Sequence, residues 1–436
     1  MNHRQTAAEA VSEVLDRAGI AELPFATRFW DGSEIAAASG SPRFTVLVEN
    51  PAALADLLRE PNQLGLGRAW VTGELDLCGD VEDVFALSER FEDVKVDWRT
   101  RLVAVARARQ LGALRRALRA HVPASESRLH GRAHSLLRDR GAISHHYDVS
   151  NDFYRLVLGP SMVYSCAYFG DPDESLESAQ ERKLDLICRK LALAPGERLL
   201  DIGCGWGSLL IHAATHYGVR AVGVTISERQ AELARSRIRE AGLSDRCEVR
   251  LVDYREIDDG PYDKIASVGM YEHVGRAELD RYIASVRALL APGGLFLNHG
   301  IARLHSSPGG PKSFIARYVF PDGELHPIDA LTTSVQAAGM ELRDVESLRE
   351  HYPLTLRAWG ANLAANRAEA IASAGEERER IWRLYMAGSA VAFERGDITV
   401  FQSLIANPGK PFGLPLDRSR IMSLSEPEGK VREESP

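Results

Sequence analysis

The sequence predicts an α/β protein in which a doubly wound, mostly parallel sheet follows a small N-terminal α+β domain. With 436 residues the chain exceeds one ordinary hydrophobic core, so two domains are expected. Five short apolar runs alternate with helical stretches such as residues 228–241, and this alternation implies βαβ crossovers. The predicted strands are residues 198–201, 220–225, 247–253, 264–268 and 295–299.

A glycine-rich turn follows the first of these strands. The chain reads Asp201-Ile-Gly203-Cys-Gly205-Trp-Gly207 and then continues into a helical pattern from Ser208. Glycines allow a sharp turn and close approach of a ligand, and the helix start offers unpaired N–H groups. The spacing is neither that of a dinucleotide fingerprint nor that of a phosphate loop. It is typical of a Rossmann-like class I methyltransferase, with a plain glycine turn of an α/β sheet as the alternative. The turn suits the methionine portion of an adenosyl cofactor.

The ends of the next two strands offer contacts for the ribose and the adenine of such a cofactor. No acid follows the second strand, so Thr225 and Gln230 are the polar candidates there. The third strand ends in Asp253 and Tyr254, which supply an acceptor for the adenine amino group and an aromatic face. For Asp253 the competing interpretation is a helix N-cap.

Three further polar residues follow later elements of the predicted sheet. Glu272 and His299 come after the fourth and fifth strands, and Tyr352 precedes a long helical region over residues 355–395. The three side chains can converge at the rim of the sheet, although none is a nucleophile. A single histidine at a strand end is more often structural than catalytic. Upstream, residues 145–154 and 162–169 are rich in aromatic and small polar side chains, which indicates a lid, a pocket wall or plain core packing.

A basic segment separates the predicted domains. Residues 99–140 carry eleven arginines against Glu126 and Asp139, although the whole chain has a net charge of −8. The segment predicts a long helix in which five apolar residues lie on one side with arginines between them: Leu102, Val105, Leu111, Leu114 and Leu118. Either this helix is a solvated connector, or it is attracted to an anionic bilayer.

The rest of the organisation follows from composition. Residues 44–48 and 69–72 predict strands and residues 51–59 and 81–87 predict helices of the N-terminal domain, and residues 398–405 predict a final antiparallel strand. The expected domains are residues 1–125, which include the basic helix, and residues 126–415, which form the catalytic domain; residues 416–436 form a disordered tail. The five cysteines lack C-x-x-C spacing, so neither a disulfide framework nor a metal site is supported.

Five segments together resemble the cyclopropane-fatty-acyl-phospholipid synthase and mycolic acid cyclopropane synthase family, a group of class I S-adenosylmethionine-dependent methyltransferases. In chain order they are Tyr164-Ser-Cys-Ala-Tyr-Phe, Leu200-Asp-Ile-Gly-Cys-Gly-Trp-Gly, Val222-Gly-Val-Thr-Ile-Ser-x-x-Gln, Ser267-Val-Gly-Met-Tyr-Glu-His-Val-Gly and Tyr318-Val-Phe-Pro-Asp-Gly. The resemblance covers residues 141–405 strongly, and the N-terminal domain resembles that of the bacterial phospholipid enzymes. It adds Tyr164, Ser165 and Ile226 to the cofactor-binding residues.

The resemblance implies S-adenosylmethionine as methyl donor and, as acceptor, the cis double bond of an unsaturated acyl chain in a membrane phospholipid. It also implies a bound bicarbonate ion. The positions that match the family's bicarbonate site are Cys166, Glu272, His299, Ile301 and Tyr352, of which Cys166 and Ile301 would contribute through the backbone. We expect Glu272 to orient the ion rather than to act as the base, since a carboxylate beside bicarbonate needs a shared proton or the donors of His299 and Tyr352. Family members often carry a cysteine where this chain has Ser389, so no cysteine nucleophile is expected there.

Other outcomes stay open at this point. The same cation can lose a different proton and give a methylene or methyl-branched chain, and the motifs do not separate the two products. Methylation of a soluble small molecule and lipid binding without catalysis are more distant alternatives. The composition and the absence of a signal peptide or of 18 consecutive apolar residues predict a cytoplasmic protein in peripheral contact with the membrane. No nucleic-acid partner is expected, and a homodimer is one state compatible with the sequence.

Overall fold

The computed structural model describes residues 5–419, apart from residues 21, 39, 61, 88–96, 114–121, 128–130, 132–133, 136–137, 140, 142–149 and 305–312. Contacts between Cα atoms divide the chain into two compact units. The N-terminal unit comprises Met1–Met162, Ala302–Pro327 and Arg349–Thr399. The Rossmann unit comprises Val163–Ile301, Ile328–Leu348 and Val400–Pro436.

The Rossmann unit is built on a sheet of seven described strands in the order β10-β11-β9-β8-β5-β6-β7. The strands are β5 (Arg198–Ile202), β6 (Arg220–Thr225), β7 (Cys247–Leu251), β8 (Tyr262–Val268), β9 (Leu290–Arg303), β10 (Glu341–Ser347) and β11 (Ile398–Ala406). Strands β5 to β9 pair in parallel, and β11 runs antiparallel to β10. The five predicted strands, the parallel sheet and the final antiparallel strand are confirmed.

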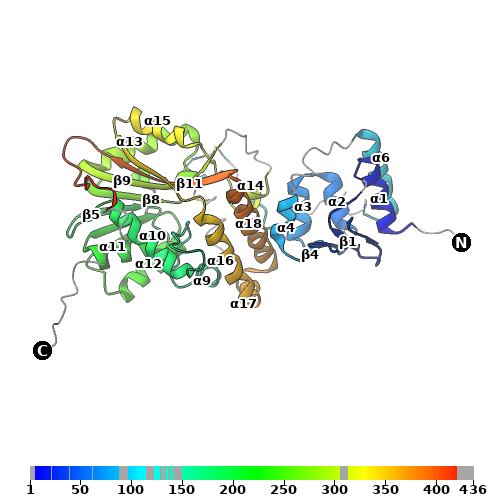
Figure 1. Cartoon of the computed structure of the whole chain (residues 1–436). Helices are drawn as coiled ribbons and strands as arrows, with labels where there is room; N and C mark the ends of the chain where they lie inside the picture. The colour runs from blue at the N-terminus through cyan, green and yellow to red at the C-terminus, as the bar shows by residue number, and fades with distance from the viewer. Residues whose placement is uncertain are drawn as a thin grey trace. The chain divides into compact units, whose positions relative to one another are not determined.

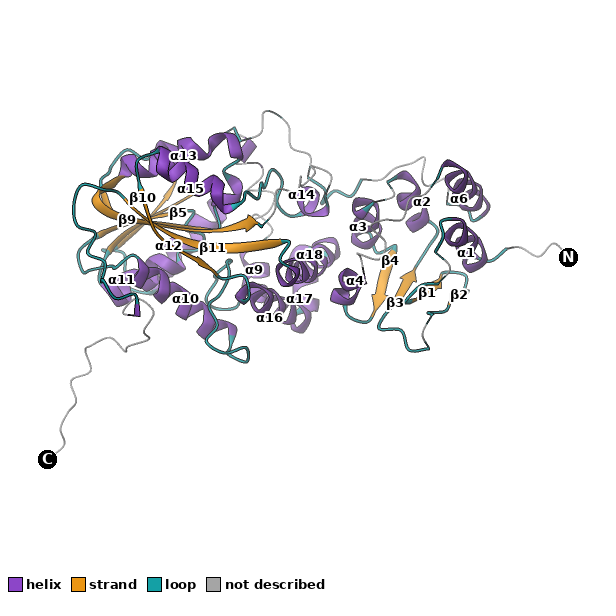
Figure 2. Cartoon of the chain, turned by 45° about the horizontal axis from the view of Figure 1, so that its top comes forward, coloured by secondary structure: helices purple, strands orange, loops and turns teal. Residues whose placement is uncertain are grey.

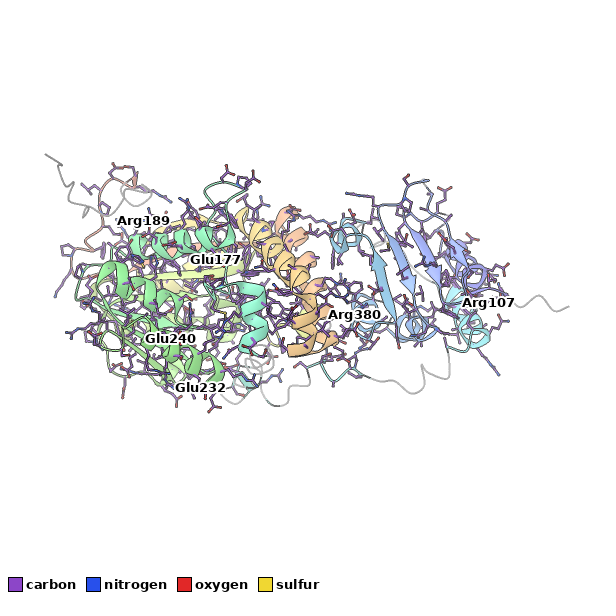
Figure 3. The ribbon with its side chains drawn as sticks, turned by 90° about the horizontal axis from the view of Figure 1, so that it is seen from below. Arg107, Glu177, Arg189, Glu232, Glu240 and Arg380 are labelled. Atoms are coloured by element: carbon purple, nitrogen blue, oxygen red, sulfur yellow. The ribbon has the colours of Figure 1, made fainter. Side chains whose placement is uncertain are left out.

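Helices cover both faces of this sheet (Figure 1). Successive residues of β5 point to opposite faces, so Leu199 packs with one set of helices and Leu200 with the other. The first set is α10 (Leu176–Lys190), α11 (Ser208–Tyr217) and α12 (Glu228–Glu240). The second set is α13 (Leu279–Leu289) and α15 (Ile328–Ala337). On α12, Glu232 and Glu240 lie on the exposed side of the helix (Figure 3).

The N-terminal unit contains a second sheet, in the order β2-β1-β3-β4 (Figure 2). Its strands are β1 (Ala26–Phe29), β2 (Glu34–Ile35), β3 (Thr45–Val48) and β4 (Leu75–Cys78). Its first helices are α1 (Ala7–Arg17), α2 (Ala52–Arg59), α3 (Gln63–Val71) and α4 (Val81–Leu87). Phe29, Val48, Ala53 and Ala69 form part of the core between them.

The predicted strand over residues 69–72 is wrong, because these residues complete α3 and its C-cap. Asn62 begins that helix: its Oδ1 accepts hydrogen bonds from the backbone N–H groups of Leu64 and Gly65, at 2.9 and 3.3 Å. This cap and the burial of Trp70 and Val71 outweigh their preference for strands.

The basic helix is shorter than predicted. Helix α6 spans Trp98–Gln110, begins at the N-cap Asp97 and ends at Leu111. Leu111 packs against the N-terminal core instead of sharing a side with Leu102, because the spacing between the two leucines corresponds to about two and a half helical turns, which puts them on opposite faces. Leu114 and Leu118 lie outside the described residues. An ion pair with α1 holds the helix in place: Arg107 Nε donates to Glu13 Oε2 at 2.7 Å (Figure 3).

Helix α9 and helices from the second half of the chain complete the N-terminal unit. They are α9 (Asn151–Leu158), α14 (Phe314–Tyr318), α16 (His351–Ala365), α17 (Arg367–Ala374) and α18 (Glu376–Arg395). Trp70 anchors α3 to α18, since its Nε1 donates to the Arg380 carbonyl at 2.8 Å and the Arg380 and Arg383 guanidinium groups lie 4.6 Å from its ring. Figure 3 marks Arg380 on this helix. These contacts explain why α16 to α18 belong to the same compact unit as the N-terminal residues.

Compact units need not coincide with contiguous domains, so the boundary at residue 125 stays a prediction. Residues 145–149, part of the predicted linker at 121–141 and residues 420–436 of the predicted tail lie outside the described part of the chain. Among the helices that the structure describes, none is both long and apolar enough to cross a bilayer.

Candidate active site

The glycine turn lies between β5 and α11 in the Rossmann unit. Its backbone has a φ of +80° at Gly203 and at Gly207, a left-handed conformation that side chains rarely adopt. A Cβ atom at Gly203 would lie 3.3 Å from Met270 Cγ, and one at Gly207 would lie 3.3 Å from Ala234 Cβ. The turn therefore needs glycine for its conformation, and Met270 and Ala234 pack closely against it.

An arginine from the next helix ties the turn down. Arg237 Nη1 donates to the Trp206 carbonyl at 2.7 Å and to Ser208 Oγ at 2.9 Å. Gly207 caps α11 without any side-chain hydrogen bond. The start of α11 therefore presents backbone N–H groups at the carboxyl end of β5, in an arrangement suited to a ligand.

Asp201 is the last polar residue of β5 before the turn. Its side chain is buried, and Oδ1 has no hydrogen-bond partner among the described residues. Burial raises the pKa of Asp201, and the nearby positive charge of Lys183 opposes that shift. A buried carboxylate oxygen without a donor is costly, so this atom is available to a positively charged group of a ligand.

Two predicted residues meet at the end of β6. Thr225 Oγ1 donates to Gln230 Oε1 at 2.8 Å, and Ser227 N donates to Thr225 Oγ1 at 3.2 Å. Both Thr225 and Gln230 are buried, whereas Ile226 between them is half-buried. Their contact with the ribose of a cofactor stays a prediction.

Asp253 caps the short helix η1 (Tyr254–Glu256), as the competing interpretation held. Its Oδ1 accepts from the backbone N–H and Nε of Arg255, at 2.9 and 2.8 Å, and its Oδ2 accepts from Arg255 Nη2 at 2.7 Å. The Tyr254 ring packs edge-on against Tyr282, with centroids 5.5 Å apart. A contact between Asp253 and adenine stays a prediction.

The segment before α10 brings Ser165 and Cys166 into the interior, while Tyr164 is half-buried. Gln180 Nε2 donates to the Ser165 carbonyl at 2.9 Å, and Lys183 Nζ donates to Ser165 Oγ at 2.7 Å. The Cys166 thiol lies 3.3 Å from the Ala167 carbonyl. Two α10 side chains thus hold this segment in place.

Glu272 and Ile301 are in direct contact. Glu272 lies on the short helix η2 (Tyr271–His273), and its Oε1 accepts the backbone N–H of Ile301 at 2.6 Å. Its other oxygen, Oε2, is buried without a hydrogen-bond partner among the described residues. Burial raises the pKa of Glu272 to about 7, and the bond from Ile301 opposes the shift. Gly300 permits this approach, because a Cβ there would lie 2.8 Å from Tyr271 Cβ.

His299 lies two residues before Ile301 on β9, so both side chains share one face of the strand. Its Nδ1 lies 3.2 Å from Gln402 Nε2, on the neighbouring strand β11. Its Nε2 is buried without a partner among the described residues. Burial, followed by the charges of Lys183 and Lys190, lowers the pKa of His299 well below its usual range. The imidazole is therefore neutral at pH 7.

Tyr352, the fifth residue predicted for the anion site, belongs to the N-terminal unit. It lies on α16, where its ring packs against Phe393 and Trp359 with centroids 4.3 and 6.4 Å apart. Its approach to Glu272 and His299 stays a prediction. Ser389 lies half-buried on α18 of the same unit.

Sequence reasoning missed Lys183 and Gln402, which contact predicted site residues. Lys183 occupies a position between Ala179 and Ile187 on the buried stripe of α10, and a lysine in that apolar stripe was a usable signal. Gln402 interrupts a buried strand in the same way. Their partners are 18 and 103 residues away in the sequence, so pattern alone does not identify them.

Comparisons with known proteins agree with the fold and the motifs. The family described as mycolic acid cyclopropane synthetase matches residues 134–403, and one described only as a domain of unknown function matches residues 12–94. A probable fatty acid methyltransferase of Pseudomonas putida is 40% identical over 391 residues, which are 88% of this chain and 92% of the relative.

Two further likenesses concern cyclopropane synthases. The cyclopropane-fatty-acyl-phospholipid synthase of Escherichia coli (strain K12) is 38% identical over 273 residues, or 63% of this chain and 69% of that enzyme. The crystal structure of mycolic acid cyclopropane synthase CmaA1 with SAH and CTAB is similar with a TM-score of 0.58 and 36% identity, over 61% of this chain and 98% of that one. The chain therefore belongs to the mycolic acid cyclopropane synthetase family and is an S-adenosylmethionine-dependent methyltransferase.

Proposed function

We propose that the protein transfers a methylene group from S-adenosylmethionine to the cis double bond of unsaturated acyl chains in membrane phospholipids, forming cyclopropane fatty acids. The observation that carries the proposal is the pair of buried, unpartnered polar atoms, Glu272 Oε2 and His299 Nε2. Glu272 follows β8 and His299 lies on β9, and β8 lies beside β5, which leads into the glycine turn. We place the donor site and the anion site at this edge of the sheet, where ligands of such sheets bind.

The residues around the glycine turn fit the methyl donor. The unpartnered Asp201 Oδ1 suits an ammonium group, and the left-handed turn lets the cofactor approach the backbone. S-adenosylmethionine supplies an electrophilic methyl group on its sulfonium. The other residues proposed to contact it are Tyr164, Ser165, Gly203, Gly205, Gly207, Thr225, Ile226, Gln230, Asp253 and Tyr254.

The unpartnered atoms of the second group fit a small oxyanion such as bicarbonate. A hydrogen bond from Gln402 Nε2 to Nδ1 of a neutral His299 leaves the ring proton on Nε2, which can donate to the anion. Glu272, with a pKa raised to about 7, can carry a proton on Oε2 and donate as well. When bound, bicarbonate supplies the base of the reaction.

The other proposed contacts of the ion are the backbone of Cys166 and Ile301 and the side chain of Tyr352. In this structure the Ile301 N–H donates to Glu272, so it can serve the ion only after that carboxyl gives it up. Glu272 thereby has two roles toward the ion. Glu272 Oε1 and the ion use the same donor, the Ile301 N–H, and a proton on the Glu272 carboxyl relieves the repulsion between two anions. We therefore assign Glu272 to orienting the ion.

The site's burial suits the chemistry of an alkene, which is a weak nucleophile. Attack on the methyl carbon breaks its bond to the sulfonium sulfur, whose bonding pair leaves with neutral S-adenosylhomocysteine, and leaves positive charge on the second alkene carbon. Loss of a proton from the transferred methyl frees its C–H electron pair, which closes onto that carbon and completes the ring. Neutral His299 and protonated Glu272 hold the compensating negative charge nearby without adding a second anion, and the buried surroundings strengthen its effect.

Helix α6 supports contact with an anionic membrane. Trp98, Leu102 and Val105 are 66%, 60% and 41% exposed and follow one another at helical spacing on a single side. Arg101 and Arg109 border the same side, and both are exposed. An exposed apolar stripe bordered by cations fits the interface of a bilayer, where the apolar side chains enter the headgroup region and each arginine adds about 1 kcal/mol.

The second candidate product is a methylene or methyl-branched chain formed from the same cation. The match to a probable fatty acid methyltransferase, which extends over 88% of the chain, favours keeping it. Lipid extracts from a host that expresses the protein and lacks such lipids distinguish the two. We expect cyclopropyl protons in the NMR spectrum of the isolated acyl chains. Exocyclic alkene protons would support the branched product, and unmodified chains would contradict both.

A further inference from the structure

Lys183 is a buried lysine that neither the motifs nor the proposed chemistry uses. Lys183 is 1% exposed in the Rossmann unit, and its Nζ donates to Ser165 Oγ at 2.7 Å. Among the described residues, Ser165 is its one hydrogen-bond partner, although an ammonium group has three donors. Burying a lysine with so few partners is costly. A ligand that accepts hydrogen bonds from the remaining N–H groups of Lys183 would offset this cost.

Asp201 on β5 carries a negative charge that attracts Lys183, although no ion pair within 4 Å joins the two among the described residues. Asp201 Oδ1 is itself without a hydrogen-bond partner there. Burial lowers the pKa of Lys183 and raises that of Asp201, and each charge opposes the shift of the other. The two residues are thus oppositely charged but not in direct contact: Asp201 Oδ1 has no donor, and the Lys183 ammonium uses one hydrogen bond, to Ser165.

We propose that Lys183 is a positioning residue for the amino-acid end of S-adenosylmethionine: held against Ser165, its ammonium neutralises the ligand's α-carboxylate while Asp201 receives the α-ammonium. A zwitterion placed between two incompletely paired, oppositely charged residues supplies the missing partner of each. The inference rests on the proposed cofactor site at the glycine turn and adds a residue that the cofactor motifs do not contain.

Three titratable groups that interact electrostatically with this pair, the thiols of Cys188 and Cys204 and the imidazole of His299, do not change charge near neutral pH. Burial raises the pKa of the Cys188 and Cys204 thiols well above their usual range, so both stay protonated. His299 stays neutral because burial and the two lysines lower its pKa. Cys166 faces Lys183 from the segment before α10. Ligand binding then requires the charged form of the pair, in which Lys183 is protonated and Asp201 is ionised.

The test compares two ligands by calorimetry. S-adenosylhomocysteine carries the α-ammonium and α-carboxylate, whereas 5′-methylthioadenosine lacks both. We expect Lys183→Met to weaken adenosylhomocysteine binding at pH 7 by about 10- to 100-fold, as for one charge-assisted hydrogen bond, and to leave methylthioadenosine binding within about threefold. Lys183→Gln keeps a donor without the charge and should behave like Lys183→Met. Equal losses for both ligands, or no loss for either, would overturn the proposal.

Lys190→Met is the matched control. Lys190 lies two turns further along α10, is also 1% exposed, and pairs with Glu346. Its replacement removes a buried charge from the same helix, so a general packing defect would appear in both variants. We expect it to leave the ratio of the two affinities unchanged. A ratio lowered as much as in Lys183→Met would overturn the assignment.

The wild-type protein gives a test that needs no variant to fold. Its ratio of adenosylhomocysteine to methylthioadenosine affinity should be highest near neutral pH. It should fall toward pH 5.5, where Asp201 takes up a proton, and toward pH 8.5, where Lys183 loses one. A ratio that stays flat over this range would contradict the proposal. If the wild-type protein binds neither ligand, the proposed cofactor site fails, and this inference fails with it.

Discussion

Gln402 Nε2 lies 3.2 Å from His299 Nδ1, and both residues are buried on neighbouring strands. An amide N–H donated to Nδ1 keeps the ring proton on Nε2, so the buried glutamine decides which edge of the imidazole can donate. In the proposed anion site that edge faces bicarbonate. The selection of one tautomer depends on this single contact.

The first prediction concerns this contact. Gln402→Glu should accept the Nδ1 proton and turn Nε2 into an acceptor, which cannot hold an anion. We expect the bicarbonate concentration needed for half-maximal activity to rise by about tenfold, as for one lost hydrogen bond to an ion. Steady-state rates in bicarbonate-depleted buffer measure this, and nitrogen NMR of labelled histidine reports the tautomer.

Ser403→Ala is the control for the first prediction. Ser403 is the next residue of β11, is equally buried, and its Oγ has no partner among the described residues. Its loss should change neither the bicarbonate requirement nor the tautomer. An unchanged bicarbonate requirement in Gln402→Glu would show that the contact is structural only.

The second prediction concerns the stability cost of Glu272. Its folded-state pKa is raised from 4.5 to about 7 by burial, so the folded protein binds more protons than the unfolded chain between these values. The free energy of unfolding therefore falls as pH rises through this window and is level above it. Glu272→Gln removes that penalty. In bicarbonate-free buffer it should match the wild type near pH 4.5 and exceed it by up to about 3 kcal/mol at pH 8.

Urea denaturation at several pH values measures this difference. The same variant should lose most of its activity, because it cannot share a proton with the anion. A Glu272→Gln enzyme with undiminished turnover would contradict the role assigned to Glu272. A stability difference independent of pH would contradict the raised pKa.

The third prediction concerns Gly300, which lies between His299 and Ile301. A Cβ there would be 2.8 Å from Tyr271 Cβ, which is closer than packed atoms tolerate. Gly300→Ala should destabilise the fold by about 1–3 kcal/mol and lower activity by displacing the strand from Glu272. Gly360→Ala on α16 is the opposite case, since nothing lies within 4 Å of its Cβ, and it should stabilise by up to about 1 kcal/mol. Thermal unfolding of both variants measures these changes. A Gly300→Ala protein as stable as the wild type would contradict the prediction.

The fourth prediction concerns α6. The double variant Trp98→Ser, Leu102→Ser should weaken binding to anionic phospholipid vesicles by about tenfold or more, since both exposed apolar side chains are lost from the interface. Vesicle flotation at several salt concentrations measures it. Leu251→Ser in the Rossmann unit, where the leucine is 45% exposed, serves as the control and should bind normally. If vesicle binding depends neither on the salt concentration nor on the double substitution, α6 is excluded as the membrane contact.

The sequence predicted the Rossmann unit well, because its signals are local. Alternating apolar runs, three glycines that need left-handed backbone and polar residues at strand ends all depend on near neighbours. The errors arose where distant contacts decide. The strand predicted around Trp70 is helical because Asn62 caps α3 and the ring packs under Arg380, 310 residues away.

The candidate site shows the same division. Asp201, Glu272 and His299 were predicted because they follow strands, whereas the atoms that tune them were not. Lys183 and Gln402 contact residues on other elements, and only folding brings them together. The direction in which a histidine donates, or the proton that a buried glutamate keeps, follows from those contacts rather than from the motif.

The most direct test of the proposed function uses purified protein, vesicles of an unsaturated phospholipid and S-adenosylmethionine labelled with carbon-13 at the methyl group. The account predicts that the label appears in the acyl chain as a cyclopropane methylene carbon, in a reaction that requires bicarbonate. Label found in an exocyclic methylene or a methyl branch, or absent from the lipid, would contradict it.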